Sequence, residues 1–257
     1  MKILFFGDVY AAPGRTLIAE KAKALKEEFS VDLLIANGEN LAGGKGLTEK
    51  TAGELFRADI DVLTGGNHLW AKAPGLDYIK RDRRVLKPLN YPAEAYGNTV
   101  FQCSIRDVDI AVLCMTGQGL MPNADSPLHC LERELLKIKA KIILIDFHAE
   151  YTGEKRAMGF YFDGKVSAFI GTHTHVQTAD EEILPKGTAY ITDVGMTGAH
   201  DSVIGVKKEI ILHTMKTGMP LMYKPAKTGL QVNAVLISFD QHTGRAVSIE
   251  RIKRSYS

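Results

Sequence analysis

The feature that most constrains the fold is the alternation of short apolar runs with amphipathic stretches over the first two thirds of the chain. Short apolar runs between turn residues predict buried strands, and apolar residues at helical spacing predict helices between them. This alternation favours an α/β fold, with either one mixed sheet or two sheets packed together, covered by helices. We expect strands at residues 2–6, 31–36, 61–64, 141–147 and 166–170.

Helices are expected between these strands, and hairpins become frequent toward the end of the chain. The expected helices lie at 16–28, 48–57, 71–80 and 207–216, from the Ser126-Pro127 cap to about 140, and between 147 and 166, closed by Gly164. The expected hairpins pair 99–105 with 108–115, 182–184 with 188–192, and 230–239 with 246–254. With no linker and no internal repeat, we expect one domain over residues 1–257.

Charge and cysteine content exclude several classes of protein. The chain has 32 Lys+Arg and 30 Asp+Glu, a net charge of +2, so we expect no stable complex with nucleic acid. Its three cysteines, Cys103, Cys114 and Cys130, cannot form a disulfide framework, which favours a reducing cytoplasm. No apolar run approaches the roughly 20 residues of a membrane span, and the apolar N-terminus is too short for a signal peptide. We therefore expect a soluble cytoplasmic protein without membrane contact.

Side chains that can bind metal ions collect where the predicted strands end. Ligand sites in open α/β sheets form beyond the carboxyl ends of the strands, so these side chains are expected to meet. All carry nitrogen or oxygen donors suited to divalent transition metals, and none is a thiol. His173 and His175 are expected to converge, because residues i and i+2 of an extended chain share a face. The candidates are Asp8, Glu39, Asn40, Asn67, His68, His148, His173 and His175.

Each candidate has an ordinary structural interpretation when it is considered alone. Asp8 suits a turn, Glu39-Asn40 a polar loop, and Asn67-His68 a tight turn after two glycines. Of the other histidines, His129 and His242 are expected to be solvated and His213 to lie at the edge of the core. The role of His200, in the glycine-rich loop 195–205, stays open.

Three common catalytic motifs are absent. Glu39 and Gly46 occupy positions where a P-loop requires glycine and serine or threonine. No Gly-x-Gly-x-x-Gly opens a helix after the first strand, and no Gly-x-Ser-x-Gly supplies a nucleophilic serine. These absences argue against a P-loop enzyme, a dinucleotide-binding enzyme and an α/β-hydrolase.

Taken in order along the chain, the candidates form a pattern that resembles the calcineurin-like metallophosphoesterases. The pattern is Asp8, Glu39-Asn40, Gly66-Asn67-His68, His148 and Gly171-Thr172-His173-Thr174-His175. Tyr10 replaces the histidine of the usual Asp-x-His, and Glu39 replaces the usual bridging aspartate. Both replacements are typical of the YmdB-type branch of bacterial phosphodiesterases. Further blocks resemble that branch over nearly the whole chain: Phe6-Gly7-Asp8-Val9, Pro13-Gly14-Arg15, Asp146-Phe147-His148-Ala149-Glu150 and Thr192-Asp193-Val194-Gly195.

The resemblance implies a dinuclear iron or manganese site in a four-layer α/β/β/α sandwich. Glu39 would bridge the two ions; one would be completed by Asp8, Asn40 and His175, the other by Asn67, His148 and His173. Two cations about 3.5–4 Å apart lower the pKa of a bridging water and stabilise the charge on phosphate oxygens during attack by the resulting hydroxide. His68 would be the general acid that protonates the leaving group.

The substrates that the resemblance implies are small phosphodiesters, 2′,3′-cyclic nucleotides or related cyclic nucleotides, and the expected assembly is a dimer or tetramer. Two alternatives stay open. A phosphomonoesterase would use the same ligands, and a regulatory protein that binds nucleotides would carry a metal site without turnover. Metal content and a substrate profile would distinguish these possibilities.

Overall fold

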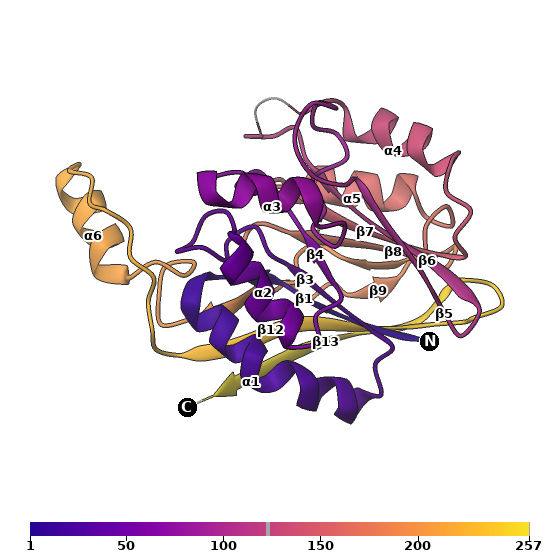
Figure 1. Ribbon diagram of the computed structural model, residues 1–257, viewed down its shortest axis with the longest axis horizontal. Helices are drawn as coiled ribbons and strands as arrows, with labels where there is room; N and C mark the ends of the chain where they lie inside the picture. Colours follow the sequence, from indigo (N-terminus) through magenta and orange to yellow (C-terminus); the bar gives the residue numbers. More distant parts are fainter. Residues whose placement is uncertain (122–123, 257) are drawn as a thin grey trace.

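Two mixed β-sheets pack face to face, with helices on both outer faces (Figure 1). The computed structural model describes residues 1–121 and 124–256. The first sheet has the order β2-β11-β12-β1-β3-β4, with β13 paired to β12; its strands are β1 (Lys2–Phe6), β2 (Asp8–Val9), β3 (Leu33–Asn37), β4 (Val62–Thr64), β11 (Met196–Ala199), β12 (Leu230–Phe239) and β13 (Ala246–Tyr256). The second has the order β5-β6-β7-β8-β10-β9; its strands are β5 (Val100–Ile105), β6 (Val108–Thr116), β7 (Ile142–His148), β8 (Ala168–Thr172), β9 (Glu182–Ile183) and β10 (Ala189–Ile191).

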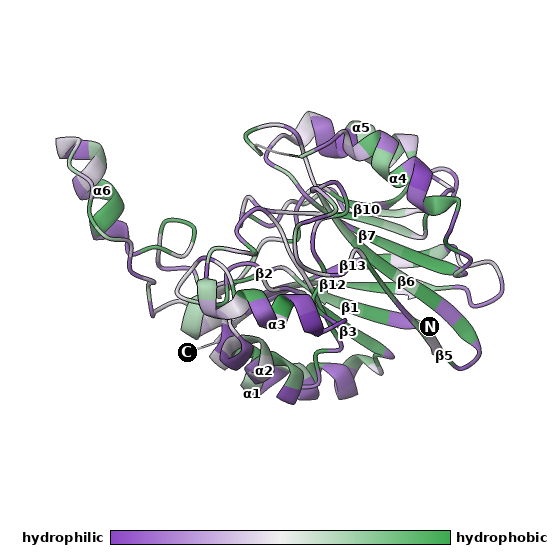
Figure 2. Cartoon of the chain, turned by 45° about the horizontal axis from the view of Figure 1, so that its top comes forward, coloured by the Kyte–Doolittle hydropathy of each residue, from purple (hydrophilic) through white to green (hydrophobic). Residues whose placement is uncertain are grey.

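Helices form the two outer layers (Figure 2). Those against the first sheet are α1 (Ala11–Phe29), α2 (Glu49–Arg57) and α3 (Leu76–Arg81), which follows the short 3-10 helix η1 (Ala73–Gly75). Those against the second sheet are α4 (Pro127–Leu135) and α5 (Thr152–Tyr161). The expected α/β/β/α sandwich is confirmed by this layering.

The alternation of side chains along β1 explains why both faces of the first sheet are covered. Ile3 and Phe5 belong to the core between the sheets, together with Ile110 and Leu144 of the second sheet. Leu4 and Phe6 point the other way and pack in the core under α1 and α2. A strand that is buried on both faces is apolar at nearly every position. This explains the continuous apolar run from Ile3 to Phe6 in β1.

Parallel pairing brings the carboxyl ends of several strands to one edge. β1 runs parallel to β3, and β3 parallel to β4. In the second sheet β6, β7 and β8 run parallel. The expected hairpins β5–β6, β9–β10 and β12–β13 are all antiparallel pairs, as predicted.

Three local expectations were wrong. α1 begins at Ala11 instead of residue 16, because Pro13 falls in the first turn, where its missing N–H would have no intrahelical partner. α4 ends at Leu135 instead of 140, and the chain then turns so that Ile138 and Ala140 reach the core. Part of the presumed loop 195–205 is β11, which pairs in parallel with Asp8–Val9.

One helix does not belong to the four layers. α6 (Lys208–Thr217) projects from the body of the protein and has no buried residue (Figure 1). His213 lies on this projecting helix and is half-buried. Within the described residues, no helix has both the length and the apolar character to cross a membrane.

Candidate metal centre

The eight candidates gather at the carboxyl-end edge of the two sheets. Asp8 lies on β2, directly after β1, and Glu39 and Asn40 follow β3. Asn67 and His68 follow β4, His148 is the last residue of β7, and His173 and His175 follow β8. Parallel pairing within each sheet and packing between the sheets thus bring side chains from five strands together.

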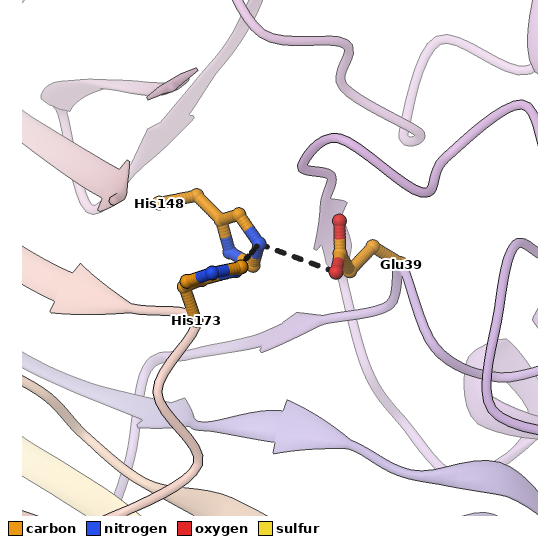
Figure 3. Close-up of side chains that lie close together, drawn as sticks. All are labelled: Glu39, His148 and His173. Carbon is orange, nitrogen blue, oxygen red and sulfur yellow. Dashed lines mark hydrogen bonds and ion pairs between the residues drawn. The ribbon is translucent and has the colours of Figure 1, made fainter. Parts of the chain in front are cut away.

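One half of the cluster centres on Glu39 (Figure 3). Its Oε1 lies 3.2 Å from His148 Nε2, and that nitrogen lies 3.0 Å from His173 Nδ1. One donor atom from each of these three residues fits within a 4.8 Å span, close enough to share a cation. The other oxygen donor expected in this half is Asn67, whose Oδ1 is buried without a hydrogen-bond partner.

The other half centres on Asp8 and Asn40, both buried. Asn40 Nδ2 lies 3.5 Å from Asp8 Oδ1 and 3.3 Å from His175 Nε2. His175 Nε2 is 3.7 Å from Asp8 Oδ1. His175 Nδ1 donates to the Ile204 carbonyl oxygen at 2.9 Å, which orients the ring so that Nε2 faces Asn40 and Asp8.

Charges in the cluster depend on one another. Burial disfavours the ionised Glu39 carboxylate, but His148 and His68 outweigh it and hold the pKa of Glu39 well below its usual range. Burial also opposes charging of His148, yet Glu39, Asp8 and Asp146 raise its pKa to about 9. Burial and the charge on His148 lower the pKa of His173 to about 3, while burial raises that of Asp8.

The donor set fits metal ions. The imidazole nitrogens of His148 and His173 lie only 3.0 Å apart, beside the carboxylate of Glu39. The amide oxygen of Asn67 has no hydrogen-bond donor. A cation bound among these groups would give each of them a partner. An unpaired buried oxygen costs free energy that a cation would recover. Carboxylate, amide and imidazole donors without thiols suit iron, manganese or zinc.

The histidine loop after β8 is held in an unusual backbone conformation. His173 has φ of 104° and His175 φ of 66°, both in the region that side chains rarely adopt. The expectation that the two share a face of an extended chain was therefore wrong: His173 faces His148, and His175 faces Asp8. Such strain persists where surrounding contacts enforce it, and it clusters at functional sites.

A buried ion pair enforces that conformation. Asp193 Oδ2 accepts hydrogen bonds from the Thr174 amide at 3.0 Å and the Thr174 hydroxyl at 2.8 Å. Lys155 Nζ donates to the same oxygen and to the Thr172 carbonyl, each at 2.8 Å. Asp193 and Lys155 were not among the sequence candidates, because only the fold brings α5 beside the residues that follow β10.

A second buried network orients His148. Its Nδ1 lies 2.9 Å from Thr172 Oγ1, and that hydroxyl donates to Asp146 Oδ1 at 2.7 Å. Asn37 Nδ2 donates to Asp146 Oδ2 at 3.0 Å. Burial raises the pKa of Asp146 to about 6. Thr172, itself held by Asp146, thus fixes the orientation of the His148 ring, as hydrogen-bond partners commonly do for histidines in metal sites.

His68 lies at the mouth of the cluster. Its amide donates to Glu39 Oε2 at 2.9 Å, and its Nδ1 lies 3.1 Å from Glu39 Oε1. The side chain is 30% exposed, so its other ring nitrogen can meet a ligand. His68 lines a cavity of about 350 Å³ together with Glu39, Asn40, His173 and His175.

The remaining histidines lie elsewhere. His129 and His242 are exposed, as expected. His200 is half-buried, and its Nε2 lies 2.9 Å from the Met196 carbonyl oxygen, within the loop after β11. It does not line the cavity.

Comparison with known proteins agrees with this architecture. The family model described as YmdB-like protein matches residues 4–252. The chain is 44% identical to the 2′,3′-cyclic-nucleotide 2′-phosphodiesterase of Bacillus subtilis (strain 168), over 98% of this chain and 96% of that protein. A solved structure described as a novel phosphatase from Mycoplasma pneumoniae has a TM-score of 0.95 at 34% identity, covering 99% of this chain and 93% of that one.

More distant structures share the fold. The NAD nucleotidase of Haemophilus influenzae has a TM-score of 0.61 at 12% identity, over 99% of this chain and 56% of that one. The assignment rests on a family match over nearly all of the sequence. It agrees with the two mixed sheets packed between helices and with the polar cluster at the strand ends. The chain belongs to the YmdB-like protein family and has the metallophosphoesterase fold.

Proposed function

We propose that this protein is a metal-dependent phosphodiesterase that hydrolyses 2′,3′-cyclic nucleotides or related cyclic nucleotides. The observation that carries the proposal is the cluster of Glu39, His148 and His173, whose donor atoms lie within 4.8 Å of one another beside a cavity that Asn40 and His175 also line. The buried Asn67 oxygen without a hydrogen-bond partner supports it. The name of the Bacillus subtilis relative supports the substrate class.

Two transition-metal ions are proposed for this site, iron or manganese. Glu39 would be shared by both ions; its carboxylate is buried, and its Oε1 lies 3.2 Å from His148 Nε2. Asp8, Asn40 and His175 would hold one ion; Asn67, His148 and His173 would hold the other. When bound, the ions would supply positive charge to the phosphate oxygens and lower the pKa of a nearby water.

The chain's own residues then have defined tasks. In hydrolysis, water adds to phosphorus and the bond from phosphorus to the ribose 2′ oxygen breaks, while the proton lost by the water passes to solvent. The departing 2′ oxygen needs a proton, and His68 can donate one from the ring nitrogen that does not face Glu39. Lys155 and Asp193 keep the His173–His175 segment in place.

Phosphomonoesterase activity is the second candidate, because the Mycoplasma pneumoniae structure is described as a phosphatase and the same ligands would serve. The test uses protein purified without chelator and loaded with Mn²⁺ or Fe²⁺. We expect about two ions per chain by elemental analysis, because seven donors exceed the needs of one open site. Adenosine 2′,3′-cyclic monophosphate should be hydrolysed faster than adenosine 3′-monophosphate, and chelator should abolish turnover.

Metal content near zero after loading would contradict the dinuclear site. Faster hydrolysis of the monoester would favour the phosphatase instead. Two bound ions without turnover of either substrate would favour a regulatory protein.

A further inference from the structure

The segment that returns from the projecting helix α6 reaches the cavity of the metal centre. Beyond α6 the chain runs back to the body, where Lys207 N donates to the Lys224 carbonyl oxygen at 3.0 Å and Ala226 N to the Gly205 carbonyl oxygen at 2.9 Å. Val206 and Pro225 form a further antiparallel bridge. Tyr223 immediately precedes this hydrogen-bonded stretch, which anchors the adjacent backbone beside the cavity.

Tyr223 lines the cavity that holds the metal-ligand candidates, and it does so with three other apolar or aromatic side chains: Tyr10, Ile204 and Val206. Tyr10 and Val206 are buried, whereas Tyr223 is 56% exposed. The cavity therefore combines polar metal-binding groups with an apolar part that includes an exposed aromatic ring. Small-molecule sites commonly combine these two kinds of lining.

The apolar part is mechanically linked to the metal centre. The Ile204 carbonyl oxygen accepts the 2.9 Å hydrogen bond from His175 Nδ1. The Tyr10 ring packs edge-on against the His175 ring, with centroids 5.6 Å apart. Gly205 has φ of 99°, and a Cβ there would lie 2.5 Å from the Tyr10 ring, so the loop closes directly on Tyr10. A ligand atom bound at His175 would therefore lie close to Ile204 and Tyr10, in the cavity that Tyr223 also lines.

A cyclic nucleotide has two chemically different parts, an anionic phosphate and a flat aromatic base. The metal-binding groups account for the phosphate, and the polar residues around them offer no apolar surface to a base. We propose that Tyr223 is the platform on which the nucleobase stacks, with Ile204 and Val206 completing an apolar subsite. The proposal rests on the proposed phosphodiesterase function and adds the residues that recognise the nucleoside.

Base stacking on Tyr223 predicts which substrates the enzyme accepts. A tyrosine face stacks on every base, and it does so without reading hydrogen bonds at the base edge. The enzyme should therefore accept purine and pyrimidine cyclic nucleotides and discriminate against a cyclic phosphate that lacks a base. Tyr223 is in this sense a specificity residue.

The test compares adenosine 2′,3′-cyclic monophosphate with methyl riboside 2′,3′-cyclic phosphate, in which a methoxy group replaces the base. The measured quantity is the ratio of kcat/KM for the two substrates in Mn²⁺-loaded enzyme. Tyr223→Ala should lower this ratio about tenfold or more, mainly through the KM of the nucleotide, because base–aromatic stacking contributes that much to binding. Tyr223→Phe keeps the ring and should keep the ratio.

Met222→Ala is the matched control. Met222 is the neighbouring residue on the same segment, is more exposed than Tyr223 and does not line the cavity. An unchanged ratio in Tyr223→Ala, or an equal fall in Met222→Ala, would overturn the subsite. Equal losses on both substrates in Tyr223→Ala would assign the residue to the shape of the metal centre instead.

Failure of the proposed function would look different. The wild type would then hydrolyse neither substrate. Calorimetric binding of adenosine 3′-monophosphate against methyl riboside 3-phosphate would still test the platform, since the preference for the nucleotide should fall about tenfold in Tyr223→Ala and hold in Tyr223→Phe. If wild type and both variants prefer adenosine 3′-monophosphate to the same extent, Tyr223 does not bind the base, whether or not the protein is an enzyme.

Discussion

The ammonium group of Lys155 on α5 lies 2.8 Å from the carboxylate of Asp193, and both side chains are buried directly behind the His173–His175 segment. The pair joins the outer helix layer to the strand end that carries two proposed metal ligands. Asp193 also accepts both hydrogen bonds from Thr174, the residue between the two histidines. The ion pair thus supports a backbone conformation that would otherwise relax.

Removing one partner of this pair should destabilise the protein and loosen the site. Lys155→Met leaves Asp193 buried and unpaired, a change that typically costs about 3–5 kcal/mol of folding free energy. We expect this loss in chemical denaturation and, in the folded fraction, weaker metal binding. Lys137→Met breaks an exposed pair with Glu134 and should cost about 1 kcal/mol or less. Equal stabilities of the two variants would show that the buried pair is not needed.

Removing the charge of Glu39 should empty the metal centre. Glu39→Gln keeps the size of the side chain but loses the negative charge that two cations would share. We expect loss of one or both ions by elemental analysis, and a fall in turnover greater than the roughly 100-fold that loss of an outer-shell partner causes. Glu54→Gln, at a carboxylate that pairs with Arg15 away from the cavity, should retain both ions. A dinuclear, active Glu39→Gln enzyme would remove Glu39 from the mechanism.

His68 should affect turnover without affecting metal content. His68→Ala removes the proposed proton donor, and loss of a general acid typically costs 10²–10⁴-fold. The cost should be large for a 2′,3′-cyclic nucleotide, whose alkoxide needs a proton. It should be much smaller for bis-(p-nitrophenyl) phosphate, because p-nitrophenolate leaves unprotonated. Equal losses on both substrates, with two ions still bound, would indicate that His68 only positions the phosphate.

Gly66 leaves the space that Glu39 and His148 occupy. A Cβ at this position would overlap Glu39 Oε2 and lie 2.5 Å from His148 Nε2. Gly66→Ala should therefore displace both side chains and lower turnover about 100-fold, the scale of a misplacement of about 1 Å. Gly153→Ala, on α5 with open space around it, should leave turnover unchanged and raise helix stability by about 0.5–1 kcal/mol. A fully active Gly66→Ala enzyme would show that the two side chains can shift without consequence.

The apolar runs of the sequence were enough to predict the layered α/β fold and most strand positions, because strands buried on both faces, such as β1 and β7, must be largely apolar. The sequence also predicted that donors from separate strands would meet, because parallel strands end at a common edge. Short elements were less predictable: β2 and β11 have too few residues for a periodic pattern, and β2 forms by pairing with β11, which in turn pairs with β12. Metal identity and an assembly of two or four chains stay predictions.

The partners of His173 and His175 could not be predicted from the sequence. Local spacing suggested that His173 and His175 share a face, but positive φ angles turn them toward different partners. Asp193 and Lys155, which stabilise that conformation, lie 38 positions apart in the chain, and no local pattern links them. The same holds for Tyr223, which reaches the cavity because its segment returns from a helix outside the core. Hydrophobic periodicity predicts which face of an element is buried, whereas such pairings arise only when distant segments pack together.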